Sequence, residues 1–296
     1  MKTCIIIAGP TAVGKTSLAI TLAQHFNTDI VSADSRQCFK ELSIGVAKPS
    51  QEQLRQVKHY FIDSHSIGQE VNAALFEQYA LEAVDTIFRS HDVAIMVGGT
   101  GLYIKAFCEG LDDIPATDMS IRNAILEAYA VNGLFWLQQE VRMADPLFYE
   151  QGEILNPQRL MRALEVKQST GKSILSFQLR HKKARDFRII KIALELPREE
   201  LYGHIDHRVD DMVQQGLLNE VSALLPYRNY NALQTVGYKE LFEYFDKRTT
   251  LEEAIALIKQ HTRHYAKRQL TWFKRDAAFS WFSPHKIDAI LAATAL

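Results

Sequence analysis

The feature that most constrains this chain is a short pattern near its start, Gly9-Pro10-Thr11-Ala12-Val13-Gly14-Lys15-Thr16. An apolar, β-rich run from Lys2 to Ala8 precedes it, and residues 17–23 follow with helical spacing. The spacing G-x-x-x-x-G-K-[ST] between a strand and a helix is that of a phosphate-binding loop. Glycines let several backbone N–H groups point at one anion, and the helix N-terminus adds partial positive charge. The pattern therefore predicts a strand–loop–helix unit that binds a ligand with two or more phosphates.

Two side chains of this loop add chemistry to the backbone. Lys15 can reach a terminal phosphate, and the hydroxyl of Thr16 can hold Mg2+. We therefore expect residues 9–16 to form the diphosphate site, with Thr16 as the metal ligand. The alternative is a glycine-rich turn that only joins strand to helix, and the flanking strand and helix make it unfavourable.

The first hundred residues alternate between short apolar runs and helical patterns. The expected strands are Thr3–Ala8, Asp29–Ser32, His59–Ile62 and Val93–Val97, and the expected helices are Thr16–His25, Ser50–Val57 and Ala73–Ser90. This alternation predicts an α/β fold, a phosphate-loop parallel sheet flanked by helices. A turn with three glycines, Gly98-Gly99-Thr100-Gly101, follows the last of these strands, at the sheet edge where ligands of such folds bind.

The pattern changes after Pro115. From residue 116 to 187 the chain reads as helices only, and Arg188–Leu196 then reads as one more strand. From Glu199 onward the chain is again mostly helical. We therefore expect a core at 1–115, an inserted all-helical subdomain at 116–187, and a region at 188–296 that completes the core and adds C-terminal helices.

Charge and cysteine usage narrow the class of protein. The net charge is −1, but residues 180–191 and 254–275 are both strongly basic, which indicates a polyanionic partner; solvated helix faces are the alternative. Three scattered cysteines without a C-x-x-C pair fit a reduced cytoplasmic protein without a zinc site. No apolar run approaches 18 residues, and the first strand leaves no room for a signal peptide, so we expect no membrane contact.

A carboxylate follows the second expected strand, in the run Asp34-Ser35-Arg36-Gln37. Beside the phosphate loop, Asp34 could bind Mg2+ or accept a proton from an incoming nucleophile; an Asx-turn or a helix cap is the alternative. The strand Val93–Val97 ends in glycines instead of the Asp that holds Mg2+ in phosphate-loop ATPases. This favours a substrate whose diphosphate is a leaving group over ordinary ATP hydrolysis.

Other candidates are cationic or amide side chains farther along the chain. Gln158, Arg159 and Arg162 follow a helix start at Pro157 and could grip a phosphate backbone; a solvated face with Glu165 as partner is the alternative. Arg208 could stabilise charge on a leaving diphosphate, although an Arg–Asp pair on a helix is more often structural. Residues 234–239 and 263–273 mix cations, amides and aromatics, which fits single-stranded RNA better than duplex DNA.

Taken together, these motifs resemble those of the bacterial tRNA dimethylallyltransferases over essentially the whole chain. The resemblance rests on residues 9–16, 34–37, 44–49, 98–103, 158–162, 234–239 and 267–273 in this order. It implies transfer of a dimethylallyl group from dimethylallyl diphosphate to N6 of adenosine 37 in tRNAs that read codons beginning with U. The implied partner is the tRNA anticodon stem-loop, the implied cofactor is Mg2+, and the protein is expected to be a monomer.

The resemblance also implies roles for individual residues. Asp34 is implied as general base, Lys15, Thr16 and Arg208 as the diphosphate clamp with Mg2+ on Thr16, and Thr100 as a residue near the leaving oxygen and the target nucleotide. The implied tRNA contacts, besides Asp34 and Thr100, are Ser35, Arg36, Gln37, Arg122, Gln158, Arg159, Leu160, Met161, Arg162, Gln234, Thr235, Val236, Gly237, Tyr238, Lys239, Lys267, Arg268, Gln269, Trp272 and Lys274.

Three other functions remain open at this point. A small-molecule kinase would explain the phosphate loop but not the helical insertion. An RNA-binding module with a nucleotide switch would leave Asp34 without a chemical task. An adenylate isopentenyltransferase would act on AMP, ADP or ATP, and it would not need the two basic stretches.

Overall fold

The computed structural model describes residues 1–178 and 182–294, and the chain forms two compact units. One, the core unit, comprises residues 1–108 and 184–296, and the other, the inserted unit, comprises residues 109–183. The sequence placed the inserted block at 116–187. Arg180, which belongs to the first basic stretch, lies outside the described residues.

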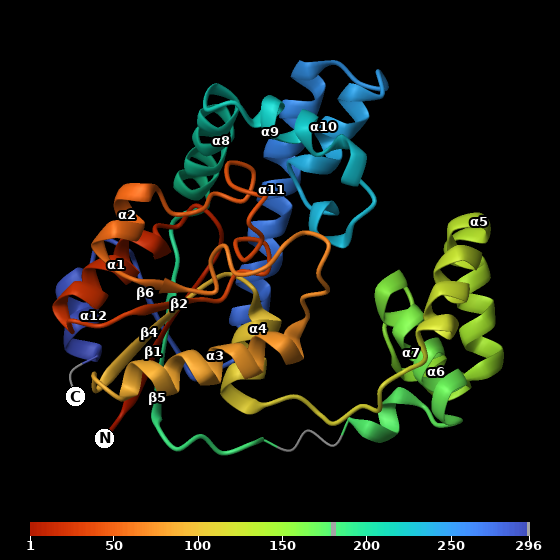
Figure 1. Cartoon of the computed structure of the whole chain (residues 1–296), viewed down its shortest axis with the longest axis horizontal. Helices are drawn as coiled ribbons and strands as arrows, with labels where there is room; N and C mark the ends of the chain where they lie inside the picture. Colours follow the sequence, from red (N-terminus) through yellow and green to blue (C-terminus); the bar gives the residue numbers. More distant parts are fainter. Residues whose placement is uncertain (179–181, 295–296) are drawn as a thin grey trace. The chain divides into compact units, whose positions relative to one another are not determined.

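The core unit is built on a six-stranded sheet in which every neighbouring pair is parallel (Figure 1). Its strands are β1 (Thr3–Ala8), β2 (Ile30–Ser32), β3 (His59–Tyr60), β4 (Val93–Val97), β5 (Arg188–Leu194) and β6 (Phe279–Phe282), in the order β3-β2-β4-β1-β5-β6. The predicted parallel sheet is confirmed. The prediction missed β6, because its four residues become a strand only by pairing with the free edge of β5.

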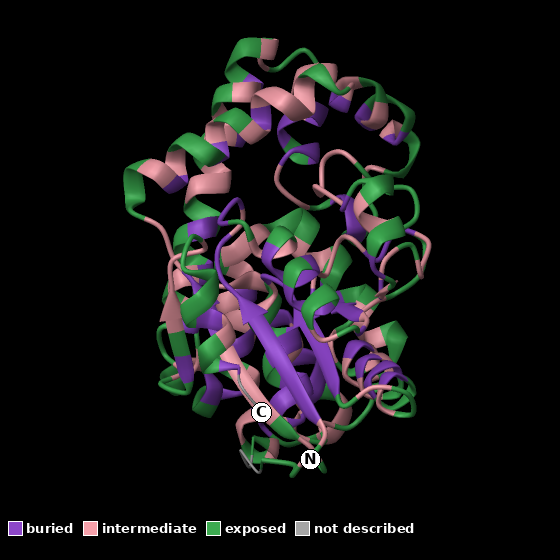
Figure 2. Ribbon diagram, turned by 90° about the vertical axis from the view of Figure 1, so that its left-hand side faces the viewer, coloured by how far each residue is buried: buried purple, intermediate pink, exposed green. Residues whose placement is uncertain are grey.

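Both faces of the sheet are covered, as the near-continuous apolar strands require. Alternate residues of β1 point to opposite faces: Ile5 and Ile7 pack with α1 (Lys15–His25), whereas Cys4 and Ile6 pack with α3 (Ala73–Phe88) and α4 (Gly101–Glu109). The strands β1, β2 and β4 are accordingly buried along their whole length, and buried strands are purple in Figure 2. Because the strands are parallel, β1, β2 and β4 end at one edge, and the loops after them meet there.

The remaining helices of the core unit lie beside this edge or complete its flanks (Figure 1). They are α2 (Gln51–Gln56), α8 (Arg198–Gln214), α9 (Leu217–Ala223), α10 (Tyr238–Phe245), α11 (Leu251–Phe273) and α12 (Ile287–Ala293), with 3-10 turns η2 (Leu225–Tyr227) and η3 (Asn231–Leu233). A capping box of Thr250 and Glu253 begins the long helix α11. Within 1–178 and 182–294, no helix is long and apolar enough to cross a membrane.

The inserted unit is all-helical, as predicted. It contains α5 (Met119–Ala144), α6 (Pro146–Gln151), α7 (Pro157–Thr170) and the 3-10 turn η1 (Ile174–Phe177). Non-helical backbone at Gly133 interrupts α5. Asn156 is the N-cap of α7 and Gly171 is its C-cap. The unit has its own apolar core between α5, α6 and α7, so its packing does not depend on the sheet.

Candidate active site

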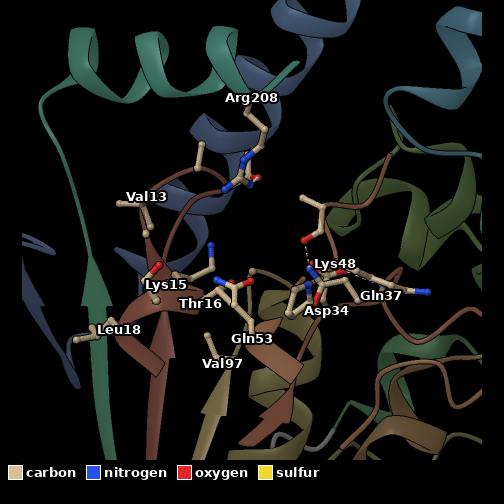
Figure 3. Close-up of a pocket in the computed structure, with 18 of the residues that line it drawn as sticks. Val13, Lys15, Thr16, Leu18, Asp34, Gln37, Lys48, Gln53, Val97 and Arg208 are labelled. Atoms are coloured by element: carbon tan, nitrogen blue, oxygen red, sulfur yellow. Dashed lines mark hydrogen bonds between the residues drawn. The ribbon is translucent and has the colours of Figure 1, made fainter. Parts of the chain in front are cut away.

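The phosphate loop connects β1 to α1, as the sequence predicts. Gly9 and Gly14 have φ angles of 141° and 96°, in the region that favours glycine. A Cβ at Gly9 would lie 2.8 Å from the carbonyl oxygen of Leu194, so β5 fixes the loop from one side. Lys15 turns back over the loop, and its Nζ donates to the carbonyl oxygen of Pro10 at 2.5 Å. Figure 3 shows Lys15, Thr16, Asp34 and Arg208 converging on one space.

The electrostatic environment of Lys15 prepares it for an anion. Burial, reinforced by the nearby Arg208 guanidinium and only partly opposed by Asp34, lowers the pKa of Lys15 from 10.5 to about 7. A buried amine next to a second cation loses its proton easily. A diphosphate bound in the loop would place negative charge next to Lys15 and would raise the pKa of Lys15 again.

Diphosphate binding is therefore expected to take up a proton above pH 7. The dissociation constant for diphosphate should rise with pH above about 7, by up to tenfold per unit, because Lys15 must then be protonated on binding. Calorimetry at pH 8 in two buffers with different heats of ionisation measures the uptake directly, and Lys15→Met should abolish it. Equal binding heats in both buffers for the unaltered protein would contradict the assignment.

Arg208 reaches the phosphate loop from α8. Its Nη1 donates to Oγ1 of Thr11 at 3.3 Å. Neighbouring aspartates are paired with cations of α11: Asp206 with Arg263 at 2.6 Å and Asp210 with Lys259 at 2.7 Å. The structural alternative was an Arg–Asp pair within this helix; the ion pairs instead join Asp206 and Asp210 to α11, and they hold α8 so that Arg208 points to the loop.

Asp34 both forms a turn and faces the phosphate loop. Its Oδ1 accepts hydrogen bonds from the backbone N–H of Arg36 at 2.9 Å and of Gln37 at 3.3 Å, which is the Asx-turn of the alternative interpretation. Both bonds use Oδ1, and a carboxylate has a second oxygen that can accept a proton. The turn is therefore compatible with a chemical role, because it fixes the direction of the carboxylate.

The Gly98–Gly101 turn after β4 packs tightly beside this segment. Oγ1 of Thr100 accepts a hydrogen bond from the backbone N–H of Ser35 at 3.1 Å. A Cβ at Gly98 would lie 2.1 Å from the carbonyl oxygen of Ala33, and one at Gly101 would lie 2.1 Å from the ring of Trp272. The glycines therefore permit close approach, and the contact places Thr100 within hydrogen-bond distance of the segment that carries Asp34.

Gly98→Ala is expected to destabilise the protein by about 2–4 kcal/mol, because the added methyl group meets backbone that cannot rotate away. Urea unfolding of both variants and the unaltered protein measures the effect. Gly203→Ala, in the middle of α8, is the matched control: its Cβ meets nothing within 4 Å, and it should stabilise the helix by about 0.5–1 kcal/mol. Equal midpoints for the two variants would show that Gly98 is not constrained by contact.

Two glutamines that we expected to contact tRNA hold loops of the site instead. Oε1 of the buried Gln269 accepts from the backbone N–H of Thr11 at 2.8 Å, and its Nε2 donates to the carbonyl oxygen of Gly99 at 2.9 Å. The amide of Gln37 donates to the carbonyl oxygen of Ala47 at 3.0 Å. Their polar groups are thus used to join neighbouring loops, which sequence spacing alone does not reveal.

Burial also corrects four other expected tRNA contacts, one of which is Gly237. Leu160 and Met161 lie in the core of the inserted unit, and Tyr238 is fully buried with its hydroxyl donating to Glu220 at 2.7 Å. Side chains without exposed surface have no area to offer an RNA. Gln158, Arg159, Gln234, Lys239, Lys267, Arg268 and Lys274 are exposed, and Arg122, Arg162, Thr235, Val236 and Trp272 are half-buried.

Two cavities of the core unit meet at Asp34. The first, of about 730 Å³, is lined by the phosphate loop, α8 and residues 46–49. The second, of about 710 Å³, is lined by Arg36, residues 234–237, Lys239, Glu240 and the middle of α11. Both cavities share the lining residues Thr11, Asp34, Val46, Ala47, Arg208, Met212 and Tyr265. The carboxylate of Asp34 and the guanidinium of Arg208 therefore lie where the cavity with the phosphate loop adjoins the second cavity.

Comparison with known proteins identifies the family. The model of the IPP transferase family matches residues 37–276. The chain belongs to this family. It is 49% identical to a tRNA dimethylallyltransferase of Cytophaga hutchinsonii over 289 residues, which cover 98% of this chain and 95% of the relative.

Solved structures of IPP transferases agree with this assignment. A tRNA isopentenylpyrophosphate transferase from Bacillus halodurans superposes with a TM-score of 0.71 at 34% identity, covering 98% of this chain and 94% of the other. A eukaryotic dimethylallyltransferase acting on tRNA superposes with a TM-score of 0.73 at 28% identity, covering 92% of this chain and 70% of the other. The predicted phosphate-loop α/β fold and the predicted family are thereby confirmed.

In this member of the IPP transferase family, the inserted unit carries a cationic cluster on α5 and α7. The carboxylate of Glu165, which is 6% exposed, lies 3.2 Å from Nη1 of Arg162 and 3.8 Å from Nε of Arg122. Both arginine side chains are about one-third exposed. Arg159 instead pairs with Glu153 at the surface, at 2.7 Å. Glu165 thus brings two partly exposed arginine side chains together as one cationic cluster.

Tyr265 is the residue of the site that the sequence analysis passed over. It lines both cavities, one turn before Gln269 on α11. The sequence analysis described residues 263–273 as a mixture of cations, amides and aromatics, and among the aromatic residues it named only Trp272 as an implied tRNA contact. The available signal for Tyr265 was its position four residues before Gln269, which places both side chains on one face of the helix.

Proposed function

We propose that this protein transfers the dimethylallyl group of dimethylallyl diphosphate to N6 of adenosine 37 in tRNAs that read codons beginning with U. The products are N6-dimethylallyladenosine and diphosphate. The observation that carries the proposal is the position of Asp34 at the boundary between a cavity with a phosphate loop and a cavity with exposed cations. The names of the relatives, tRNA dimethylallyltransferases at 42–49% identity, support the same reaction.

The proposed reaction exchanges one bond for another at the allylic carbon. The N6 amine of adenine forms the carbon–nitrogen bond, and the carbon–oxygen bond to diphosphate breaks. Asp34 accepts the proton that N6 releases, because an exocyclic amine is a weak nucleophile without a base. Lys15, Arg208 and the loop N–H groups stabilise the charge on the leaving diphosphate. The target adenine must leave the anticodon-loop stack to reach Asp34.

Thr16 fits a magnesium ion that the substrate itself would largely hold. Mg2+ in such sites keeps several waters and is bound mainly by substrate phosphates, with one or two protein oxygens. Thr16 lines the first cavity at the start of α1, and β4 ends in glycine instead of a carboxylate. When bound, the ion would add positive charge to the departing diphosphate. The positive charge that the protein itself places next to the diphosphate comes from Lys15 and Arg208.

Exposed and half-buried cations give the proposed tRNA surface. Around the second cavity, Arg36, Lys239 and Arg268 can meet phosphates of the anticodon loop, and Gln234 adds an amide. In the inserted unit, Arg122 and Arg162 form the cluster that Glu165 orders. We also propose that the protein acts as a monomer, because one chain lines both cavities.

Loss of both ordered arginines is expected to weaken tRNA binding about 10- to 50-fold at low salt. Arg122→Gln with Arg162→Gln removes two cations, so the slope of log K against log salt should fall by about 1–2. Filter binding over a salt series measures both quantities. Arg89→Gln is the control: this arginine at the C-cap of α3 is 75% exposed and pairs with Asp85, and its loss should change neither quantity. An unchanged slope of log K against log salt in the double variant would show that both arginines have only a structural role.

The experiment that tests the proposed function is incubation with dimethylallyl diphosphate and unmodified tRNA, with and without Mg2+, followed by nucleoside mass analysis. AMP and ATP serve as parallel acceptors. We expect a five-carbon mass gain on adenosine in tRNA alone. A gain on AMP or ATP instead would indicate an adenylate isopentenyltransferase, and ATP turnover without any gain would indicate a kinase.

A further inference from the structure

Tyr265 stands at the boundary where the two cavities adjoin. It lines both, together with Asp34 and Arg208, and it is 36% exposed although it lies in the middle of α11. It belongs to none of the apolar clusters of the core unit. Part of its side chain is therefore uncovered at the cavities and is not used for packing.

The neighbours of Tyr265 are charged groups of the proposed acceptor side. The guanidinium of Arg268 lies over its ring, 5.7 Å from the centroid. Burial, with the negative charge of Asp34, raises the pKa of Tyr265 to about 12, against smaller effects of Arg36, Arg268 and a hydrogen bond with Gln269. The hydroxyl is therefore protonated at neutral pH and cannot take the proton from the acceptor amine. This leaves the ring as the part of Tyr265 that can act on a substrate.

We propose that Tyr265 is a positioning residue for the acceptor base: the extruded adenine stacks on its ring, which directs N6 toward Asp34. This inference rests on the proposed function. A purine outside its own stack loses base–base contacts, and an aromatic side chain replaces them for any base. Gln269 holds the part of α11 that carries Tyr265 in place, because it links this turn of the helix to the phosphate loop and to Gly99.

The test separates the ring from the hydroxyl. Tyr265→Leu removes the ring and keeps a good helix former, whereas Tyr265→Phe keeps the ring and removes only the hydroxyl. Stacking on one residue is worth about 10- to 100-fold in kcat/KM for RNA. We expect that loss in Tyr265→Leu, rescue to within about threefold in Tyr265→Phe, and a dissociation constant for dimethylallyl diphosphate within about twofold of the original in both. Tyr227→Leu, an exposed tyrosine that lines neither cavity, is the control.

A binding readout without turnover completes the test. An anticodon stem-loop with 2-aminopurine at the acceptor position has no 6-amino group and cannot be prenylated, and its fluorescence falls when the base stacks on an aromatic ring. Bound to saturation, it should be at least about twofold brighter on Tyr265→Leu than on the unaltered protein or on Tyr265→Phe.

Three results would overturn the inference: full activity and unchanged fluorescence in Tyr265→Leu, equal losses in the Leu and Phe variants, or weakened binding of dimethylallyl diphosphate with unchanged fluorescence. The unaltered protein is assayed with tRNA in parallel. If it transfers no prenyl group, the proposed function fails, and if it does while the Tyr265 variants behave as just described, only the positioning role fails.

Discussion

Asp34→Asn is expected to lower the rate of prenyl transfer by about 10²–10⁴ while dimethylallyl diphosphate binds within about threefold of its original affinity. An asparagine keeps the oxygen that accepts from the N–H groups of Arg36 and Gln37, so the turn that positions the side chain survives. It cannot, however, take up the proton that N6 releases. Single-turnover measurement with tRNA at saturating diphosphate isolates the chemical step.

Asp34→Ala separates the two roles of this carboxylate. It removes the base and also the two hydrogen bonds of the turn, so the segment that carries Arg36 is free to move. We expect the same loss of rate as for Asp34→Asn and an additional rise in KM for tRNA. Normal turnover in Asp34→Asn, with its turn intact, would show that Asp34 is not the base.

Lys15→Met is expected to lower kcat/KM for dimethylallyl diphosphate by about 10³. It removes one charged donor aimed at the leaving group, in a site where such a donor is worth about 10²–10³ or more. Arg208→Gln should cause a similar loss. The double variant should lose less than the product of the two, because both side chains act on one anion. Initial rates over a range of diphosphate concentrations measure all three variants.

Lys15→Met is expected to preserve or raise the stability of the fold, although it lowers activity. Between pH 7 and 10.5 the unfolded chain holds a proton on Lys15 that the folded protein releases, so this group destabilises the fold at neutral pH and less so as the pH rises. Lys15→Met should therefore leave the melting temperature at pH 7 unchanged or higher. A lower melting temperature would mean that the bond from Lys15 to Pro10 is structural, and the loss of activity would then not identify an anion site.

The elements that the sequence predicted best are the buried strands next to glycine-rich loops. The predicted strands Thr3–Ala8 and Val93–Val97 agree with β1 and β4 at every residue, because unbroken apolar runs in a parallel sheet end where glycine begins. The strand predicted at His59–Ile62 is only two residues long, His59–Tyr60. Phe61 is fully buried and has φ of 63°, so the chain turns there in spite of its apolar sequence.

The roles of single polar side chains were harder to predict. Spacing identifies that Gln37, Gln269 and Glu165 lie near functional segments, but it does not show whether their polar groups face a ligand or a neighbouring loop. In the structure these groups are used by backbone atoms or by arginines of the same unit. A buried amide or carboxylate must find such partners, and the partners come from segments that no local pattern connects.

The phosphate loop, the α/β alternation, the helical insertion and the family were all predictable from the sequence, because each depends on residue patterns and their order along the chain. The hydrogen bonds that Arg208 and Gln269 make with Thr11 span 197 and 258 positions of the chain, and they could be seen only in the folded structure. These contacts follow from how α8 and α11 pack against the edge of the sheet. That packing is fixed by ion pairs and burial between distant segments, which also bring Tyr265 to the boundary where Asp34 lies.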